Sequence, residues 1–201
     1  MKGILFKPWK IKAIADSSPD FKWLTRRLGG LEEINQEPDK WMSTGVTYAG
    51  GEIEFYRLDS NRYSLIKPRY QVGEVVYIKE AYRVIDVDLR DLSWDTPLHN
   101  TQVEYRIDGE RLWQLRPQEK QILYPDKWHS PMTMPAWAAR LFCQVLEVRP
   151  ELFRFRDMSK EELEMDSFLV LEGGKSVEVL LKERYDGKWV WRYEFQSKFG
   201  G

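Results

Sequence analysis

The sequence predicts a single domain of the α+β class, in which a few short helices decorate a small open β-barrel or a strongly curved sheet. Three observations lead to this prediction. Segments rich in β-branched and aromatic residues alternate with polar residues, the helical patterns are short, and no repeat or heptad run is present. The length of 201 residues suits one domain, and 42% hydrophobic and 31% charged residues are ordinary for a globular protein.

Alternation and turn signals place the individual elements. Pro8 suits the first turn of a helix, Ser159 and Glu162 form a capping box, and Asp108-Gly109 is a hairpin turn. Residues 29–70 and 85–125 read as inserts in the domain. The predicted helices lie at 8–15, 159–166 and 177–184, and the predicted strands at 3–6, 53–58, 63–67, 75–79, 103–107, 141–149 and 188–195.

Composition limits the classes of function. A formal net charge of -1 argues against a protein coated with Lys and Arg for bulk nucleic-acid binding, but it allows a local basic pocket. Aromatic residues reach 14%, with 9 Trp. We expect most of these rings in the core and some as a base-stacking platform.

The cysteine and histidine content and the hydropathy argue against disulfides, a metal site and a membrane span. The single Cys143 permits no disulfide within the chain and is expected to be a small buried hydrophobe, which fits a reducing compartment. His99 and His129 have no partner at metal-ligand spacing, so we predict neither a metal site nor a cofactor. The apolar run at the N-terminus is too short for a signal peptide, and no run is long enough for a membrane span. We therefore expect a cytoplasmic protein that does not interact with membranes.

Segment 22–27 carries the densest chemistry of the chain, with the sequence Lys22-Trp23-Leu24-Thr25-Arg26-Arg27. A helical or turn-like loop would place the Lys22 amine beside the Thr25 hydroxyl, because i and i+3 then share one face. The two arginines would raise the local positive potential, lower the pKa of the lysine and favour an anionic or nucleic-acid ligand. The alternative is an ordinary basic surface loop.

Several motifs occur together in a recognisable order along nearly the whole chain. With them, the sequence resembles the ASCH-domain family of the PUA-like superfamily, in the form common in phages and prophages. The motifs are K-x-x-T-R-R at 22–27, Y-I-K-E-A-Y at 77–82, M-P-A-W-A-A-R at 134–140, M-S-K-E-E at 158–162 and W-V-W-R-Y-E-F at 189–195.

The resemblance implies a PUA-like β-barrel with a cleft lined by segment 22–27. Family members are generally inferred to bind RNA or nucleosides, and one branch is similar to amidohydrolases that remove the acetyl group of N4-acetylcytidine. That branch carries K-x-x-T-x-R, which Lys22, Thr25 and Arg27 match, whereas many other members have Glu where Thr25 stands. Asp166 stands at the place of the family's catalytic Glu, and it is one methylene shorter.

If the protein cleaves an amide, each candidate site residue has an expected role. Thr25 would be the nucleophile and Lys22 its base, and a carboxylate from Asp166, Glu164 or Glu80 would orient the lysine or protonate the leaving amine. Arg26 or Arg27 would bind a phosphate or the developing oxyanion, and the Trp23 ring would contact the ligand. Three functions stay open: hydrolysis of an N4-acyl cytidine amide, binding of RNA, single-stranded nucleic acid or a modified nucleoside without turnover, and a phage assembly or host-interaction role.

Overall fold

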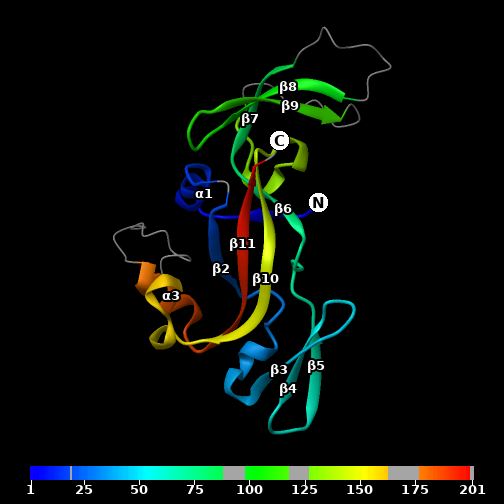
Figure 1. The fold of residues 1–201 in the computed structure, drawn as a ribbon, viewed down its shortest axis with the longest axis vertical. Coiled ribbons are helices and arrows are strands. Elements are labelled where there is room, and N and C mark those ends of the chain that lie inside the picture. Colours follow the sequence, from blue (N-terminus) through cyan, green and yellow to red (C-terminus); the bar gives the residue numbers. More distant parts are fainter. Residues whose placement is uncertain (19, 88–97, 118–126, 163–176, 200–201) are drawn as a thin grey trace. The chain divides into compact units, whose positions relative to one another are not determined.

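The computed structural model describes residues 1–18, 20–87, 98–117, 127–162 and 177–199. Strands predominate over short helices in these residues, which confirms the predicted α+β class (Figure 1). No helix in the described ranges is long and apolar enough to cross a membrane. The chain groups into two compact units, each built from segments that are far apart in the sequence. Unit 1 comprises Met1–Phe21, Val75–Cys143 and Ser197–Gly201, and unit 2 comprises Lys22–Glu74 and Gln144–Gln196.

Unit 1 contains a parallel pair of strands near the N-terminus. β1 (Gly3–Leu5) pairs with β6 (Val75–Lys79), and Gly3 lies opposite Tyr77. A Cβ atom at Gly3 would lie 2.6 Å from Tyr77 Cζ and 2.4 Å from Lys79 Cε. Glycine at this position therefore allows the side chains of β6 to cross over β1.

Helix α1 (Pro8–Ala15) begins at its proline, as predicted. Ile11 and Ile14 form its buried face, at 2% and 0% exposure. Lys10 is buried as well, and its ammonium lies 5.5 Å from the centroid of the Phe6 ring. This contact compensates part of the desolvation of the lysine.

Three antiparallel strands of unit 1 form a second sheet, in the order β7-β8-β9. The strands are β7 (Tyr82–Val87), β8 (Leu98–Tyr105) and β9 (Arg111–Pro117). Gly109, with φ +73°, turns the chain between β8 and β9, and its N–H donates to Tyr105 O at 2.8 Å. The predicted Asp108-Gly109 hairpin is confirmed, and the second predicted insert contains both of its strands.

Two tyrosines fix the segment that leads into β10 (Leu141–Phe153), whose residues 141–143 belong to unit 1. This segment contains two 3-10 turns, η4 (Pro131–Thr133) and η5 (Ala136–Ala138). The buried Tyr77 hydroxyl donates to Met134 O at 3.0 Å, and the buried Tyr105 hydroxyl donates to Ala138 O at 2.8 Å. These phenols satisfy carbonyl groups that such short turns leave without a backbone partner. Trp137 and Arg140 are thereby held against the core of the unit.

The main sheet of unit 2 has the order β10-β11-β2, and Figure 1 shows these strands side by side. β2 (Lys22–Arg27) is antiparallel to β11 (Lys188–Phe199). The segments η6 (Phe155–Asp157) and α3 (Val177–Tyr185) contribute to a core that covers one face. The Tyr185 hydroxyl donates to Arg26 O at 2.9 Å, which ties α3 to β2. The buried members of this core are Phe153, Leu181, Tyr185 and Val190.

The first predicted insert forms a separate antiparallel sheet in unit 2, in the order β3-β4-β5. The predicted hairpin is confirmed, with Asn61 at φ 50° in its turn. A half-buried asparagine then joins the preceding turn to β11, since Asn35 Nδ2 donates to Trp189 O at 2.9 Å and Trp189 N donates to Asn35 Oδ1 at 2.7 Å. The elements are η1 (Ile34–Gln36), η2 (Pro38–Lys40), β3 (Trp41–Thr47), β4 (Ile53–Arg57) and β5 (Arg62–Ile66).

Cys143 provides a direct test of packing in unit 1. Its thiol is fully buried, as predicted, and burial raises its pKa. Because the chain has one cysteine, we expect a thiol reagent to label the native protein far more slowly than the unfolded chain. The measurement is the labelling rate against denaturant concentration. A native rate equal to that of the unfolded chain would show that this strand is not buried.

Candidate functional site

Segment 22–27 forms a strand, and the predicted helical or turn-like loop was wrong. β2 pairs with β11 along its whole length, from Lys22 opposite Gln196 to Arg27 opposite Trp191. Successive side chains of a strand point to opposite faces, so residues three apart also lie on opposite faces. Lys22 is exposed and Thr25 is 7% exposed. The strand therefore separates the amine from the hydroxyl that the loop was expected to bring together.

Thr25 and Arg27 lie on one face of this strand pair, together with Trp23. Their cross-strand neighbours are Trp191, Tyr193 and Phe195, so the face is rich in rings. The rings of Trp23 and Phe195 are stacked at 5.9 Å and 21°. Tyr70, from the loop after β5, meets Tyr193 edge-on at 5.5 Å. We call Trp23, Thr25, Arg27, Tyr70, Trp191, Tyr193 and Phe195 the aromatic face.

Polar groups on the aromatic face are deeply buried. Burial raises the pKa of Tyr193 to about 12, although the backbone of Tyr70 and Arg69 and the charge of Arg27 act in the opposite direction. The phenol is therefore neutral at physiological pH and can donate a hydrogen bond. Arg27 is the partly buried member of this face, so it is the first group that a ligand from solvent would meet.

Trp191 carries a donor for which the described part of the chain offers no acceptor. The residue is 0% exposed, and its indole N–H makes no hydrogen bond to a described residue. Gly30, at φ +86°, passes beside it, and a Cβ atom there would lie 3.8 Å from Trp191 Nε1. Bare backbone therefore lies next to this N–H. A buried donor without an acceptor is unfavourable by about 1–3 kcal/mol, and a ligand oxygen that reached this N–H would remove that cost.

Arg26 points to the opposite face, where it is already held by carboxylates. Its Nε donates to Glu151 Oε1 at 2.9 Å, its Nη2 lies 3.5 Å from Glu162 Oε2, and its Cζ lies 4.8 Å from the centroid of Phe153. Arg192 lies directly across the strand pair and is bridged by the same Glu162, at 3.5 Å. The carboxylates offset the repulsion between two facing cations. The predicted role of Arg26 in ligand binding would require these ion pairs to break.

Glu80 belongs to unit 1 and is also committed to an ion pair. Its side chain is 0% exposed, and Arg140 donates to both carboxylate oxygens at 2.9 Å. Burial raises the pKa of Glu80, and the hydrogen bonds from Arg140 lower it again. Arg140 also contacts Asp108 at 2.7 Å and Glu110, and it stacks 4.4 Å from the centroid of Tyr105. The geometry gives Glu80 a structural partner rather than a reacting one.

The remaining predicted acid, Asp166, lies outside the described residues, as does Glu164. The helix start that precedes it is as predicted, since Ser159 Oγ accepts from Glu162 N at 3.1 Å. Within the described ranges, no three His, Cys, Asp or Glu residues gather in a way that could hold a metal ion.

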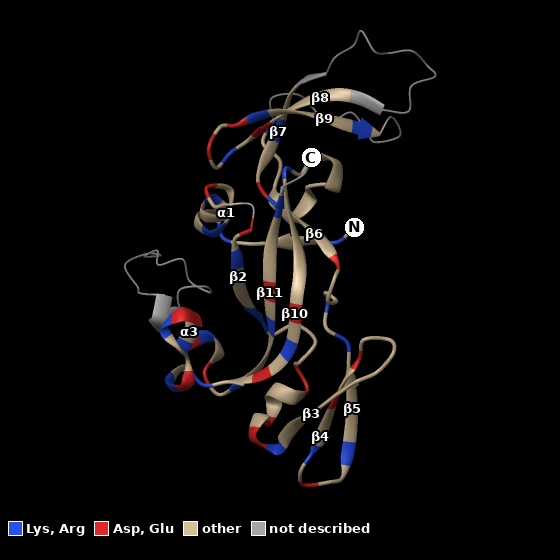
Figure 2. Cartoon of the chain, in the orientation of Figure 1, with Lys and Arg blue, Asp and Glu red and all other residues tan. Residues whose placement is uncertain are grey.

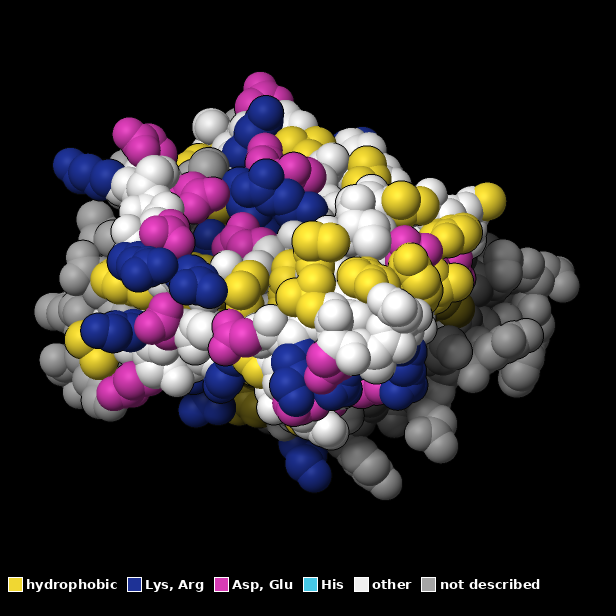
Figure 3. Space-filling view, turned by 90° about the horizontal axis from the view of Figure 1, so that it is seen from below, with side chains coloured by type: hydrophobic (Ala, Val, Ile, Leu, Met, Phe, Trp, Pro, Cys, Tyr) yellow, Lys and Arg dark blue, Asp and Glu magenta, His cyan; other side chains and the backbone are white. Residues whose placement is uncertain are grey.

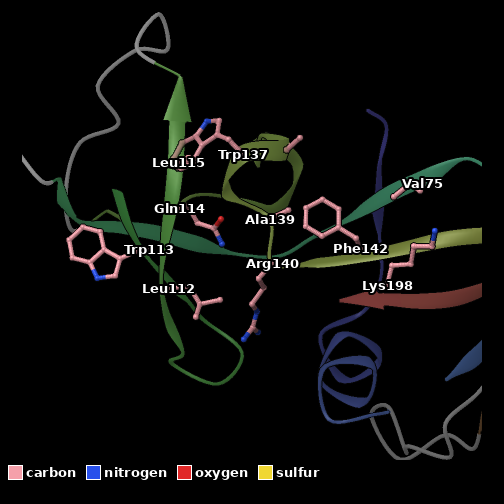
Figure 4. A pocket seen from close by; sticks show the side chains of 11 residues that line it. Val75, Leu112, Trp113, Gln114, Leu115, Trp137, Ala139, Arg140, Phe142 and Lys198 are labelled. Carbon is pink, nitrogen blue, oxygen red and sulfur yellow. The ribbon is translucent and has the colours of Figure 1, made fainter. Parts of the chain in front are cut away.

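Sequence reasoning missed a hollow beside β9 in unit 1 (Figure 4). Its volume is about 710 Å³. We call it the β9 hollow. Trp113 and Leu115 are 52% and 57% exposed, although both are large and apolar. The alternation of Leu112 and Gln114 with Trp113 and Leu115 is the signal that could have identified it. Its lining is Val75, Leu112, Trp113, Gln114, Leu115, Ala136, Trp137, Ala139, Arg140, Phe142 and Lys198.

Charges of both signs are mixed in the described residues. Figure 2 shows Lys and Arg next to Asp and Glu on the same elements, for example around α3. On the face shown in Figure 3, blue and magenta side chains alternate around yellow hydrophobic ones, without a separate basic area. Electrostatic attraction of a polyanion would therefore have to come from local groups such as Arg27.

No protein-family model, curated protein or solved structure matches this chain.

The Glu80–Arg140 pair predicts a large loss of stability on substitution. Arg140→Ala leaves a fully buried carboxylate without its cation, and we expect the free energy of unfolding to fall by about 3–5 kcal/mol. Without the arginine, burial acts unopposed and the pKa of Glu80 rises further. The folded state then retains the proton, so the loss should be largest near neutral pH and shrink as the pH approaches the ordinary value of 4.5. Chemical denaturation at several pH values measures this.

Arg111→Ala is the matched control, because the Arg111 side chain is 55% exposed and lies 3.4 Å from Glu104. Its effect should be about 0–1 kcal/mol. Equal losses for the two variants would contradict the assignment of Glu80 to a buried pair.

Proposed function

We propose that this protein binds RNA, single-stranded nucleic acid or a modified nucleoside at the aromatic face, without hydrolysing it. The observation that carries the proposal is the buried Trp191 N–H, which has no acceptor in the described residues and lies beside Gly30 on the face that holds Thr25 and Arg27. The resemblance to ASCH domains supports the same ligand class. We likewise propose the PUA-like barrel as the architecture.

The chemistry of the aromatic face suits a nucleobase. Single-stranded nucleic acids are recognised by ring stacking and by hydrogen bonds to base edges. The Trp191 N–H would donate to a base carbonyl, and the Thr25 and Tyr193 hydroxyls would add donors or acceptors. Arg27 would contact a phosphate, because its guanidinium forms charge-assisted hydrogen bonds with phosphate oxygens.

Amide hydrolysis has less support. A general base must lie within hydrogen-bond reach of the nucleophile that it activates, and the alternation of β2 directs Lys22 and Thr25 to opposite faces. Glu80 is held by Arg140 on both oxygens, so it is not available to orient Lys22. Binding without turnover is therefore the better reading of these residues.

The first experiment titrates the full chain with single-stranded RNA oligonucleotides, cytidine and N4-acetylcytidine, and follows tryptophan fluorescence. We expect Arg27→Ala to weaken RNA binding by roughly 10- to 100-fold, the loss expected for a charged hydrogen bond of about 1.5–3 kcal/mol. Affinity should also fall as salt rises, because phosphate neutralisation releases counterions. Lys22→Ala on the other face, and Arg62→Ala, whose side chain is 59% exposed on β5, are the matched charge controls. If Lys22→Ala loses RNA binding while Arg27→Ala binds normally, the binding site does not lie on the aromatic face.

The second experiment tests turnover directly. Purified protein is incubated with N4-acetylcytidine, and deacetylation is followed by absorbance. We expect no rate above background, because Lys22 and Thr25 do not share a face of β2. A rate that Lys22→Ala and Thr25→Val each abolish, with a double variant no worse than either, would show that the two residues act as a unit and would establish a hydrolase instead.

A further inference from the structure

β9 is the outer strand of the β7-β8-β9 sheet. The Tyr105 N–H donates to Glu110 O at 3.0 Å. This bond determines which residues of β8 and β9 are hydrogen-bonded to each other. Bonded positions alternate along an antiparallel strand, so Leu112 and Gln114 direct their backbone groups toward β8. Trp113 and Leu115 then direct their N–H and C=O groups away from the sheet. An outer strand of this kind is a template for pairing with another strand.

The same two residues expose large apolar side chains. Trp113 is 52% and Leu115 57% exposed, and both border the β9 hollow, with the Trp113 ring on the side of β9 that faces away from Phe142 (Figure 4). An exposed apolar area that coincides with a strand edge to which no described strand pairs marks an interaction surface.

The polar groups of the β9 hollow are mostly occupied from within unit 1. Gln114 Nε2 donates to the Tyr105 hydroxyl at 3.2 Å, and Arg140 contacts the carboxylates of Glu80, Asp108 and Glu110. Apolar side chains on a partner strand suit this lining better than a nucleotide does.

The sequence of β9 is compatible with pairing to itself. An antiparallel arrangement centred on Gln114 places Trp113 opposite Leu115 of the other copy and Arg111 opposite Pro117. The Trp113–Leu115 pairs are then apolar on both sides, Leu112 lies opposite Arg116, and no two like charges are directly opposed. A two-fold arrangement of this kind uses the same surface on both copies, which is the commonest symmetry of protein oligomers.

We propose that two copies of this chain associate through β9, whose outer edge, to which no described strand pairs, pairs antiparallel with β9 of the second copy. The backbone groups of Trp113 and Leu115 form the new ladder, and their side chains are covered on association. The surface lies entirely within unit 1 and is independent of the aromatic face in unit 2.

Sedimentation velocity of the full chain over a wide range of concentration tests the proposal. We expect wild-type protein to approach twice the chain mass of 24.0 kDa as concentration rises. Leu115→Lys should sediment as a single chain throughout, because each lysine would lie opposite Trp113 of the other copy and its charge would have to be buried at the new edge. Leu65→Lys is the matched control, since Leu65 is 52% exposed on β5, the outer strand of another sheet. It should associate like wild type.

Hydrogen exchange adds a readout on the wild-type chain, which does not depend on how well a variant folds. Amides of segment 111–117 should gain protection as concentration rises, whereas amides of segment 62–66 should not. A wild-type chain that sediments at 24.0 kDa at every concentration overturns the proposal. The proposal is also overturned if Leu65→Lys fails to associate while Leu115→Lys associates like wild type. A single-chain species in which RNA binding requires Trp113 would instead make the β9 hollow a base-stacking platform.

Discussion

The antiparallel register of β2 and β11 is the constraint on which the candidate site depends. Once Thr25 lies opposite Tyr193, the alternation of the strand assigns every side chain of segment 22–27 to a face. Arg27 joins the aromatic residues, Arg26 joins the carboxylates and Lys22 lies in solvent. A shift of one residue would exchange these environments completely, placing Arg26 among the rings and Thr25 among the acids. The chemistry of this segment is therefore a consequence of pairing geometry.

Buried charge is the second organising feature, and it occurs in each unit. Arg140 holds Glu80 in unit 1, and Arg26 and Arg192 share Glu151 and Glu162 in unit 2. Such groups contribute little net stability relative to apolar packing, because desolvation offsets most of the attraction. They do penalise any alternative packing that separates the partners. In both units the charged side chains thus favour one arrangement of the strands over its neighbours.

Much of the fold could be predicted because most strands carry their own signal. The alternating segments at 53–58, 63–67, 75–79 and 188–195 correspond to β4, β5, β6 and β11. The sequence of β2 favours a loop, because the segment is short, bears three cations and adjoins Gly29-Gly30. Its burial is created by β11, which is distant in sequence. The same dependence on a distant partner hid the separation of Lys22 from Thr25 and the pairing of Glu80 with Arg140. The solvent exposure of Trp113 could not be predicted from the sequence either, because local sequence does not reveal which strand of a sheet is outermost.

The position of β11 in the sheet has a consequence for synthesis on the ribosome. β11 lies between β10 and β2, and it follows both of them along the chain. Until it emerges, β2 lacks the strand that covers its backbone, and Trp23 and Leu24 lack the neighbours that bury them. The nascent chain therefore carries an incomplete sheet until β11 is synthesised, and closure depends on contacts between residues more than 160 positions apart, as between Lys22 and Gln196. Such long-range closure is slow relative to local folding, so the apolar residues of β2 stay uncovered for longer than those of the hairpins.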